Sequence, residues 1–246
     1  MPFLRRVGLE DTAPVHGYPF ELAAVRGVDQ IEFATVTTLV GDNGSGKSTL
    51  IEALGIAAGF NPEGGSRNLN FATLDTHSEL HRYLQLQWNQ RPRWGWFLRA
   101  ETFYGMASHI ARDNDARTGV ASMFPDLHSR SHGESFLELA LARFERPGFY
   151  LLDEPESALS ITGQLALLAI MRRACDRGAQ FVVSTHSPLL MAYPGASIYQ
   201  LSIDAPPSAR TFDEVEAVQV WRLFLDEPSM FLEALFSNDD PEPTET

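Results

Sequence analysis

The chain has 246 residues, a formal net charge of −13 at pH 7 and a single cysteine, Cys175. Its length allows one α/β domain with an inserted lobe, or two small domains. The negative charge excludes a protein that coats nucleic acid by bulk electrostatics, because phosphate binding needs a concentrated positive surface. One cysteine excludes an internal disulfide framework, and the sequence shows neither a secretion signal nor an apolar run long enough to cross a membrane. We therefore expect a cytoplasmic protein without direct membrane insertion.

Two strands are predicted near the start of the chain, over residues 20–25 and, with a break, 31–40. Two aromatic residues here, Tyr18 and Phe20, are candidates to stack on an adenine, since aromatic faces bind bases without reading them. Core packing is the alternative for either ring.

Residues 41–49 read Gly-Asp-Asn-Gly-Ser-Gly-Lys-Ser-Thr and satisfy the phosphate-loop pattern G-x-x-x-x-G-K-[ST] between an apolar run and a helical run. The glycines let the backbone turn tightly and aim its N–H groups at a polyphosphate. Lys47 is expected against the β- and γ-phosphates, and Ser48 is expected to offer its hydroxyl to Mg²⁺. The predicted ATP-binding residues of this loop are Asn43, Gly44, Ser45, Gly46, Lys47, Ser48 and Thr49.

The stretch 83–101 has β character with a turn at 89–93, which predicts a hairpin. From Arg82 to Arg99 it carries arginines and three tryptophans without an acidic residue, against the acidic trend elsewhere. It is therefore the candidate patch for DNA or a partner, the alternative being that these residues stabilise the hairpin alone.

Ser131-His132-Gly133-Glu134 precedes an amphipathic pattern that predicts a helix from Gly133 or just after it. A serine and a glycine amide at a helix N-terminus form a second anion site.

Residues 149–155 predict a buried parallel strand that ends in two carboxylates. Asp153 is placed to hold Mg²⁺, and Glu154 to orient or deprotonate the attacking water. A helix over 159–173 and a buried strand over 181–184 lead to His186. We interpret His186 as a γ-phosphate sensor, the alternative being a satisfied core histidine.

Near the end of the chain, residues 225–228 imitate this acidic motif. They lie in a helical pattern over 218–225 and no strand with a sensor histidine follows, so we interpret them as non-catalytic. The acidic stretch 239–246 has almost nothing to bury and is expected to be disordered.

Taken in order, these motifs resemble the ATP-binding cassette (ABC) class of ATPases. The matching segments are 41–48 (Walker A), 131–134 (signature), 151–154 (Walker B), 157–160 (D-loop) and His186 (switch histidine). Within the class, the forms R-A-E-[ST]-F, S-H-G-E-S-F and D-E-P-E-[SA]-A-L-S are similar to small stand-alone bacterial ATPases labelled AAA-family, relatives of the chromosome-maintenance and recombination ATPases.

The resemblance implies an α/β P-loop NTPase fold of ABC type, with a mixed central sheet flanked by helices, an antiparallel β subdomain and a small helical lobe. We expect one domain over 1–246, made of a nucleotide-binding core (17–60 and 145–205), an inserted lobe with the signature (61–144), a C-terminal helical segment (206–238) and the acidic tail.

The resemblance further implies a head-to-tail dimer that sandwiches two ATP molecules, with Ser131, Gly133 and Glu134 of one subunit completing the other subunit's site. Two positions depart from the class pattern. Ser160 ends the D-loop, where aspartate is the norm. The class also has a glutamine after the strand of the lobe, on the metal side of the site. Here Glu101 stands at the comparable place, and Gln87 is a weaker candidate for the same role.

The expected function is Mg²⁺-dependent ATP binding and hydrolysis that drives a DNA-related or defence process, with DNA or a nuclease as partner. One alternative is an ATP-switched clamp or scaffold with slow turnover. The other is the ATP-binding subunit of a transporter, which would need a membrane partner.

Overall fold

The computed structural model describes residues 1–62, 64–66, 77–103 and 132–237. Six strands form the main sheet, and a separate two-stranded sheet lies beside it. From one edge to the other the main sheet contains β4 (Gly95–Arg99), β5 (Phe149–Asp153), β6 (Gln180–Ser184), β2 (Val36–Val40), β7 (Ser197–Gln200) and β8 (Ser208–Arg210). The first five strands are parallel and β8 pairs antiparallel with β7, so the sheet is mixed, as predicted.

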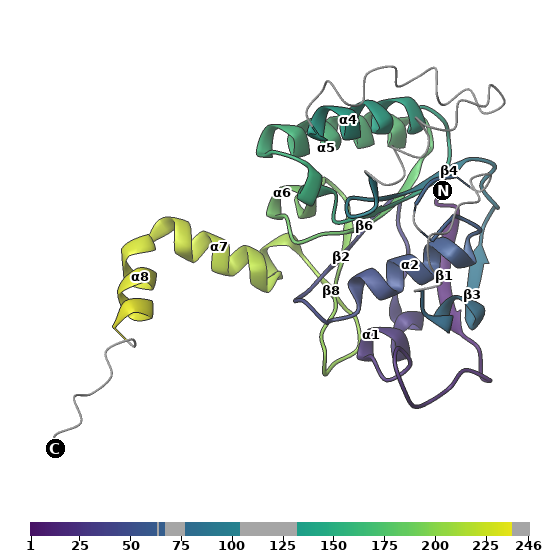
Figure 1. Ribbon diagram of the computed structural model, residues 1–246, viewed down its shortest axis with the longest axis horizontal. Helices are drawn as coiled ribbons and strands as arrows, with labels where there is room; N and C mark the ends of the chain where they lie inside the picture. The colour runs from purple at the N-terminus through teal and green to yellow at the C-terminus, as the bar shows by residue number, and fades with distance from the viewer. Residues whose placement is uncertain (63, 67–76, 104–131, 238–246) are drawn as a thin grey trace.

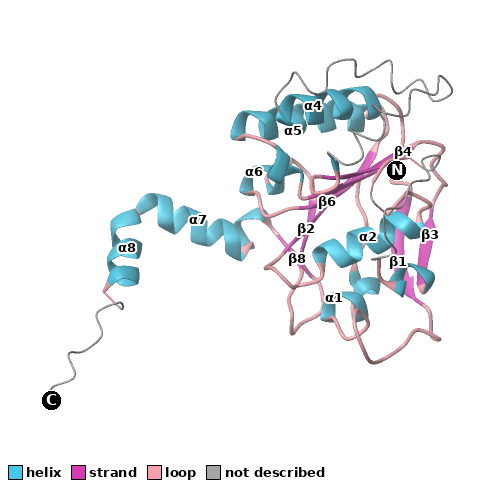
Figure 2. Ribbon diagram, viewed as in Figure 1, coloured by secondary structure: helices cyan, strands magenta, loops and turns pink. Residues whose placement is uncertain are grey.

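Helices cover both faces of the main sheet (Figures 1 and 2). The helices whose bounds the structure describes are α1 (Ala23–Arg26), α2 (Lys47–Ala57), α4 (His132–Arg143), α5 (Ile161–Asp176), α6 (Pro188–Met191), α7 (Glu216–Asp226) and α8 (Pro228–Phe236). Of these, α7 and α8 do not cover the sheet. Alternate residues of β5 serve two cores: Leu152 packs in the core that α4 and α5 complete, and Leu151 in the core of α2. Strands buried on both faces explain the continuous apolar runs of β2, β5 and β6.

The small antiparallel sheet pairs β1 (Leu4–Leu9) with β3 (Leu84–Trp88). The predicted hairpin over 83–101 is therefore wrong, because β4 pairs with β5 in the main sheet and not with β3. Burial gives the reason. The three central residues of β4 are all buried and need cover on both faces, whereas β3 alternates buried and solvent-facing positions.

The predicted strand over 20–25 is also wrong. Residues 23–26 form α1, in which the Gly27 N–H donates to the Ala23 carbonyl (3.0 Å), and a 3₁₀ turn follows at Val28–Gln30. The two alanines favour a helix, and only the run from Val36 pairs in the sheet.

At the end of the described chain, α7 and α8 extend away from the body (Figure 1). The start of α7 is held by a small cluster in which Val215 and Val218 contact Val40, Met191 and Ile198. The helical pattern predicted over 218–225 is thus confirmed. None of the helices in the described ranges is long and apolar enough to cross a membrane.

Candidate nucleotide-binding and catalytic site

The candidate site lies where four neighbouring parallel strands end. In such sheets ligands bind at the carboxyl ends of the strands. The register aligns Arg99 of β4 with Asp153 of β5, and Asp153 with Ser184 of β6, so the residues that follow these strands meet at one edge. A cavity of about 390 Å³ opens there, lined by Ser48, Ala100, Glu101, Asp153, Glu154 and Ser157.

The phosphate loop connects β2 to α2 along this edge. Gly41 and Gly44 have φ angles of +144° and +82°, which a side chain would disfavour. A Cβ at Gly41 would approach the Leu201 carbonyl to 2.2 Å, so the loop start is packed tightly, whereas a Cβ at Gly44 would meet no atom within 4 Å. The backbone at Gly44 is therefore open to a ligand.

Lys47 begins α2, and its side chain reaches back into the loop. Its Nζ donates to the carbonyls of Gly41 (2.7 Å) and Asp42 (3.0 Å). Burial lowers the pKa of Lys47, and the nearby Glu154 carboxylate opposes this shift. The ammonium, the amides and the positive end of an 11-residue helix form a set of groups that fits a polyphosphate.

Asp153, the last residue of β5, is buried beside Arg99. Burial raises the pKa of Asp153 to about 6, and the Arg99 guanidinium works in the opposite direction. Arg99 Nε lies 3.4 Å from Asp153 Oδ2, while its Nη1 donates to Glu52 Oε2 (2.7 Å) and to the Pro62 carbonyl (3.1 Å). Asp153 Oδ1 is buried and accepts no hydrogen bond of ordinary geometry from the described residues. With the Ser48 hydroxyl in the same cavity, this oxygen fits a hard cation such as Mg²⁺.

Glu154 has a left-handed backbone, with φ 47° and ψ 51°, and is the one non-glycine residue with positive φ in the described ranges. Its N–H donates to the Ser184 carbonyl (2.9 Å), which ties the end of β5 to β6. Its Oε1 lies 3.6 Å from His186 Nε2. The unusual backbone thus turns Glu154 into the cleft toward His186, a kind of strain that is typical of functional sites.

Glu156 lies in the 3₁₀ turn Pro155–Ala158, directly after the acidic pair. Its Oε1 accepts a hydrogen bond from the His186 N–H (2.5 Å), and its Oε2 is buried without a partner in the described residues. A carboxylate therefore connects the turn after β5 to the loop that carries His186.

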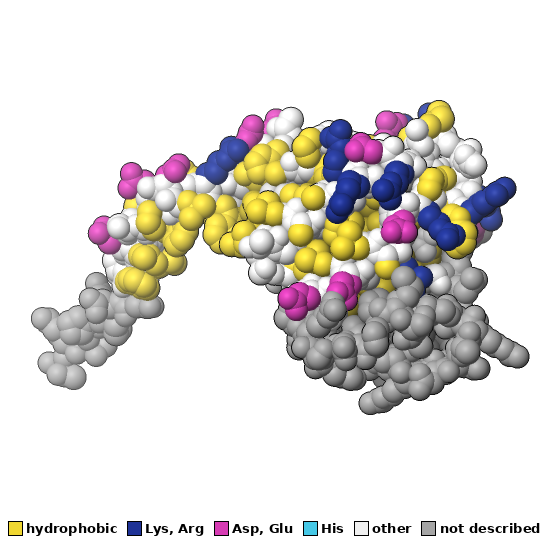
Figure 3. Space-filling view, turned by 90° about the horizontal axis from the view of Figure 1, so that it is seen from above, with side chains coloured by type: hydrophobic (Ala, Val, Ile, Leu, Met, Phe, Trp, Pro, Cys, Tyr) yellow, Lys and Arg dark blue, Asp and Glu magenta, His cyan; other side chains and the backbone are white. Residues whose placement is uncertain are grey.

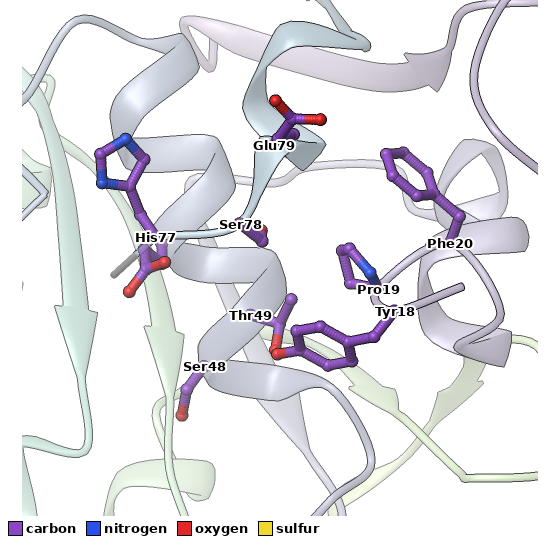
Figure 4. A pocket seen from close by; sticks show the side chains of 9 residues that line it. Tyr18, Pro19, Phe20, Ser48, Thr49, His77, Ser78 and Glu79 are labelled. Carbon is purple, nitrogen blue, oxygen red and sulfur yellow. The ribbon is translucent and has the colours of Figure 1, made fainter. Parts of the chain in front are cut away.

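A second cavity, of about 490 Å³, adjoins the first through Ser48 (Figure 4). Tyr18 lies across the first turn of α2, with its hydroxyl 2.8 Å from Thr49 Oγ1, and is 71% exposed. Phe20, by contrast, is 5% exposed and packs edge-on against Tyr83. Of the two aromatic candidates, Tyr18 alone offers an accessible face.

Comparison with known proteins places these features in a family. The family described as "AAA domain, putative AbiEii toxin, Type IV TA system" matches residues 36–92 and 72–192, more than half of the chain. The chain belongs to this AAA-domain family. With the cleft, the phosphate loop and the relatives below, this identifies an ATPase of the ABC type.

Among its relatives, the AAA-domain chain is 29% identical over 199 residues to the zinc import ATP-binding protein ZnuC of Alkalilimnicola ehrlichii, covering 76% of this chain and 74% of ZnuC. It is also 29% identical to the hemin import ATP-binding protein HmuV of Gloeobacter violaceus, covering 64% of this chain and 65% of HmuV. Among solved structures, it resembles the SMC head domain from Thermotoga maritima with a TM-score of 0.43 and 19% identity, covering 73% of this chain and 91% of that domain.

The structure of the AAA-domain chain separates several predicted positions. Glu101 lines the cleft, whereas Gln87 lies on β3 opposite Arg6 in the small sheet. Gly133 and Glu134 lie in the first turn of α4, where a Cβ at Gly133 would come within 3.2 Å of the Ala158 carbonyl. Ser131 and the acidic tail lie outside the described residues.

The arginines and tryptophans of 82–99 do not form one patch in this AAA-domain chain. Trp96 is buried with the Arg143 guanidinium over its ring (4.5 Å), while Trp94 is half exposed beneath Arg146 (4.1 Å). Arg99 belongs to the cleft. The segment divides because β4 enters the main sheet and β3 does not.

Sequence reasoning missed Arg99, Glu52 and Glu156 as residues of the site. Arg99 carried a usable signal, because a charged residue ends the apolar run of β4 as Asp153 ends that of β5. For Glu156 the signal was a third acidic residue within four positions.

Proposed function

We propose that this protein is a Mg²⁺-dependent ATP hydrolase that works as a head-to-tail dimer with ATP bound between the subunits. The observation that carries the proposal is that Asp153 and Glu154 line one cleft at the strand ends, with Lys47 near enough to interact electrostatically with both carboxylates. His186 Nε2 lies 3.6 Å from the Glu154 carboxylate, so these groups come from the ends of three adjacent strands. These side chains supply the cation, metal-side carboxylate, base and polar contact that phosphoryl transfer uses.

Each side chain has a role that its surroundings support. Lys47 and the loop amides bind phosphate, and Ser48 with Asp153 Oδ1 holds Mg²⁺, which when bound neutralises charge on the phosphates. Glu154 accepts the proton of the attacking water, and His186, 3.6 Å from it, contacts the γ-phosphate. Glu101 lies at the metal side of the same cleft. Tyr18 is the candidate aromatic contact of the base.

The dimer is proposed from a predicted second anion site. Gly133 and Glu134 lie in the first turn of α4, Ser131 shortly precedes them in the sequence, and in this proposal the three residues complete the partner's phosphate loop. Complementation tests this arrangement. Lys47→Ala and Ser131→Arg are each expected to abolish turnover, while a mixture of the two proteins is expected to recover up to about a quarter of wild-type turnover, because half of the dimers are mixed and each holds one intact site. No recovery, with both proteins folded, would contradict the sandwich.

The process that hydrolysis drives is, in this proposal, DNA-related or defensive, with DNA or a nuclease as partner. The family description, which names a putative AbiEii toxin and a type IV TA system, supports the defence reading. An ATP-switched clamp with slow turnover is the variant in which hydrolysis only resets binding. The test is whether the Glu154→Gln protein retains DNA in the presence of Mg-ATP, with a retention that weakens steeply as salt is raised. Retention that is the same with and without ATP would contradict a DNA-related role of the ATPase.

A second candidate is the ATP-binding subunit of a transporter, favoured by the import proteins among the relatives. It predicts that membranes containing the partner retain the Glu154→Gln protein and raise wild-type turnover. Full turnover without membranes, and no retention, would contradict this candidate.

A further inference from the structure

The C-terminal arm, defined as α7 and α8 over residues 216–236, exposes an unusual amount of apolar surface. Half of the sixteen exposed large hydrophobic side chains in the described residues lie within these 21 residues. They are Val220, Trp221, Leu223, Leu225, Met230, Leu232, Leu235 and Phe236. Only Val218 of the arm is buried. Such a concentration of exposed apolar side chains marks an interaction surface.

The arm is anchored next to the catalytic edge. At its base Val215 and Val218 contact Val40, the residue directly before the phosphate loop, and Met191, in the helix after His186. Phe224 and Phe231 stack edge-to-face at 5.9 Å, which holds α8 against the end of α7. The arm therefore leaves the body beside the strand that leads into the phosphate loop. Figure 1 shows it extending away from the sheet.

A second apolar surface borders the same edge. Ile161 (69% exposed) and Leu165 (50% exposed) lie four residues apart on one face of α5. They follow Ser160, which caps α5 by accepting the Gly163 N–H (3.1 Å), and the turn before it contributes Ser157 to the cleft. Figure 3 shows hydrophobic side chains along one side of the arm and acidic side chains along the other.

We propose that the arm of each copy docks on the first two turns of α5 in the second copy when the ATP-bound dimer forms. The proposal rests on the proposed sandwich dimer and adds a second contact between its two subunits. A two-fold dimer uses the same patches on both subunits, so each copy gives one arm and receives one. The two helices, at about 16 Å and 14 Å in length, are long enough to cross a subunit boundary.

Charge is the first argument for a second copy as the occupant. The arm carries four acids, Glu216, Asp226, Glu227 and Glu233, and one base, Arg222. On the receiving side, Arg172 and Arg173 lie about two turns beyond Leu165 on α5. Arg172 pairs with Asp176 (3.0 Å), so Arg173 is the positive side chain of α5 that faces no acid of its own helix. A stable interface buries roughly 800 Å² per partner around an apolar centre, and aromatic anchors dominate its affinity. Trp221, half exposed, is such an anchor.

Cysteine cross-linking between differently tagged copies tests the contact. Both copies carry Glu154→Gln, to slow turnover, and Cys175→Ala; one adds Val220→Cys and the other Leu165→Cys. With a short bismaleimide, we expect a cross-linked heterodimer at least ten times more abundant with Mg-ATP than without. The matched control replaces Leu165→Cys by Arg91→Cys, an exposed site in the loop before β4 at the opposite edge of the sheet, and is expected to give none.

The outcomes separate this inference from the proposed function. A protein that binds ATP but stays monomeric overturns both. A dimer that forms with Mg-ATP yet gives no cross-link between copies overturns the arm contact alone. As a second measurement, Trp221→Ala is expected to weaken ATP-dependent dimerisation about 30-fold, the size of an interface hot spot, with nucleotide binding unchanged. Gln219→Ala, on the polar face of α7, is the control: it removes one exposed hydrogen bond to the Asp213 carbonyl (3.0 Å) and should leave dimerisation unchanged.

Discussion

The tetrapeptide Leu-Asp-Glu-Pro occurs twice in this chain, at 152–155 and at 225–228, in opposite surroundings. In the first copy Asp153 ends a buried parallel strand and is 6% exposed. In the second, Asp226 ends α7 and both acids are exposed. The chemistry therefore belongs to the sheet edge and its neighbours, and not to the tetrapeptide.

The backbone of the two glutamates shows what the surroundings supply. Glu154 is left-handed, with φ 47°, and its N–H bonds to Ser184 of the neighbouring strand. Glu227 has φ −136°, and its N–H continues the helix by bonding to the Leu223 carbonyl (3.0 Å). Only the first glutamate is directed by long-range contacts toward a histidine and a cleft.

The largest expected effect comes from replacing each of the two glutamates by glutamine in a separate variant. Glu154→Gln removes the proposed base and should lower kcat by about 10²- to 10⁴-fold while ATP binding is kept. Glu227→Gln should leave kcat unchanged. Phosphate release under single-turnover and steady-state conditions measures both, and equal rates in the two variants would contradict the distinction between the copies.

Next in size is the loss of the arginine that accompanies the first copy. Arg99→Met leaves Glu52 and Asp153 as unpaired, largely buried carboxylates and should lower the free energy of unfolding by about 3 kcal/mol. Arg222, near the second copy, pairs with Asp213 at 2.6 Å on the surface, so Arg222→Met should cost under about 1 kcal/mol. Urea unfolding compares the two variants. A small loss of unfolding free energy in both would show that Arg99 does not stabilise the carboxylates at the edge of the sheet.

Ionisation of Asp153 gives a pH-dependent difference between the copies. Because its pKa is raised from 3.8 to about 6, the folded protein holds this proton more tightly, and stability is lost as pH rises through about 6. Over this pH range, ionisation of Asp153 lowers the free energy of unfolding by about 3 kcal/mol. Asp153→Asn should therefore be more stable than the wild type at pH 7.5 without metal, with a difference that shrinks toward pH 4. Asp226→Asn should have the stability of the wild type at every pH. If Asp153→Asn were more stable than the wild type by the same amount at every pH, ionisation of the Asp153 carboxyl would be excluded as the cause.

The smallest of these effects concerns the residue after each tetrapeptide, which is Glu156 in the first copy and Ser229 in the second. Glu156→Ser removes the acceptor for the His186 N–H and should lower kcat about 10-fold, the size of a hydrogen bond to a charged group, with little change in ATP affinity. Ser229→Glu is the reciprocal control and should be silent. A loss of affinity without a loss of kcat would contradict a positioning role for Glu156.

What the sequence predicted well was local. The phosphate loop, the buried strand before Asp153 and the helix over 218–225 each follow from residues adjacent in the chain. The failures were long-range. Pairing of β3 with β1 rather than β4 depends on residues some eighty positions away, and the Arg99 to Glu52 contact spans 47 residues. Residue patterns register burial but not which strand supplies it, so they led to the wrong hairpin. The mixed sheet was predicted correctly, but from the resemblance to the ABC class.

The most direct test of the central claim is the solution mass of the Glu154→Gln protein with and without Mg-ATP. The sandwich dimer predicts a single chain without nucleotide and a doubled mass with Mg-ATP, and Glu227→Gln should show the doubled mass only transiently, as ATP is consumed. A Glu154→Gln protein that binds Mg-ATP and keeps the mass of one chain would contradict the account.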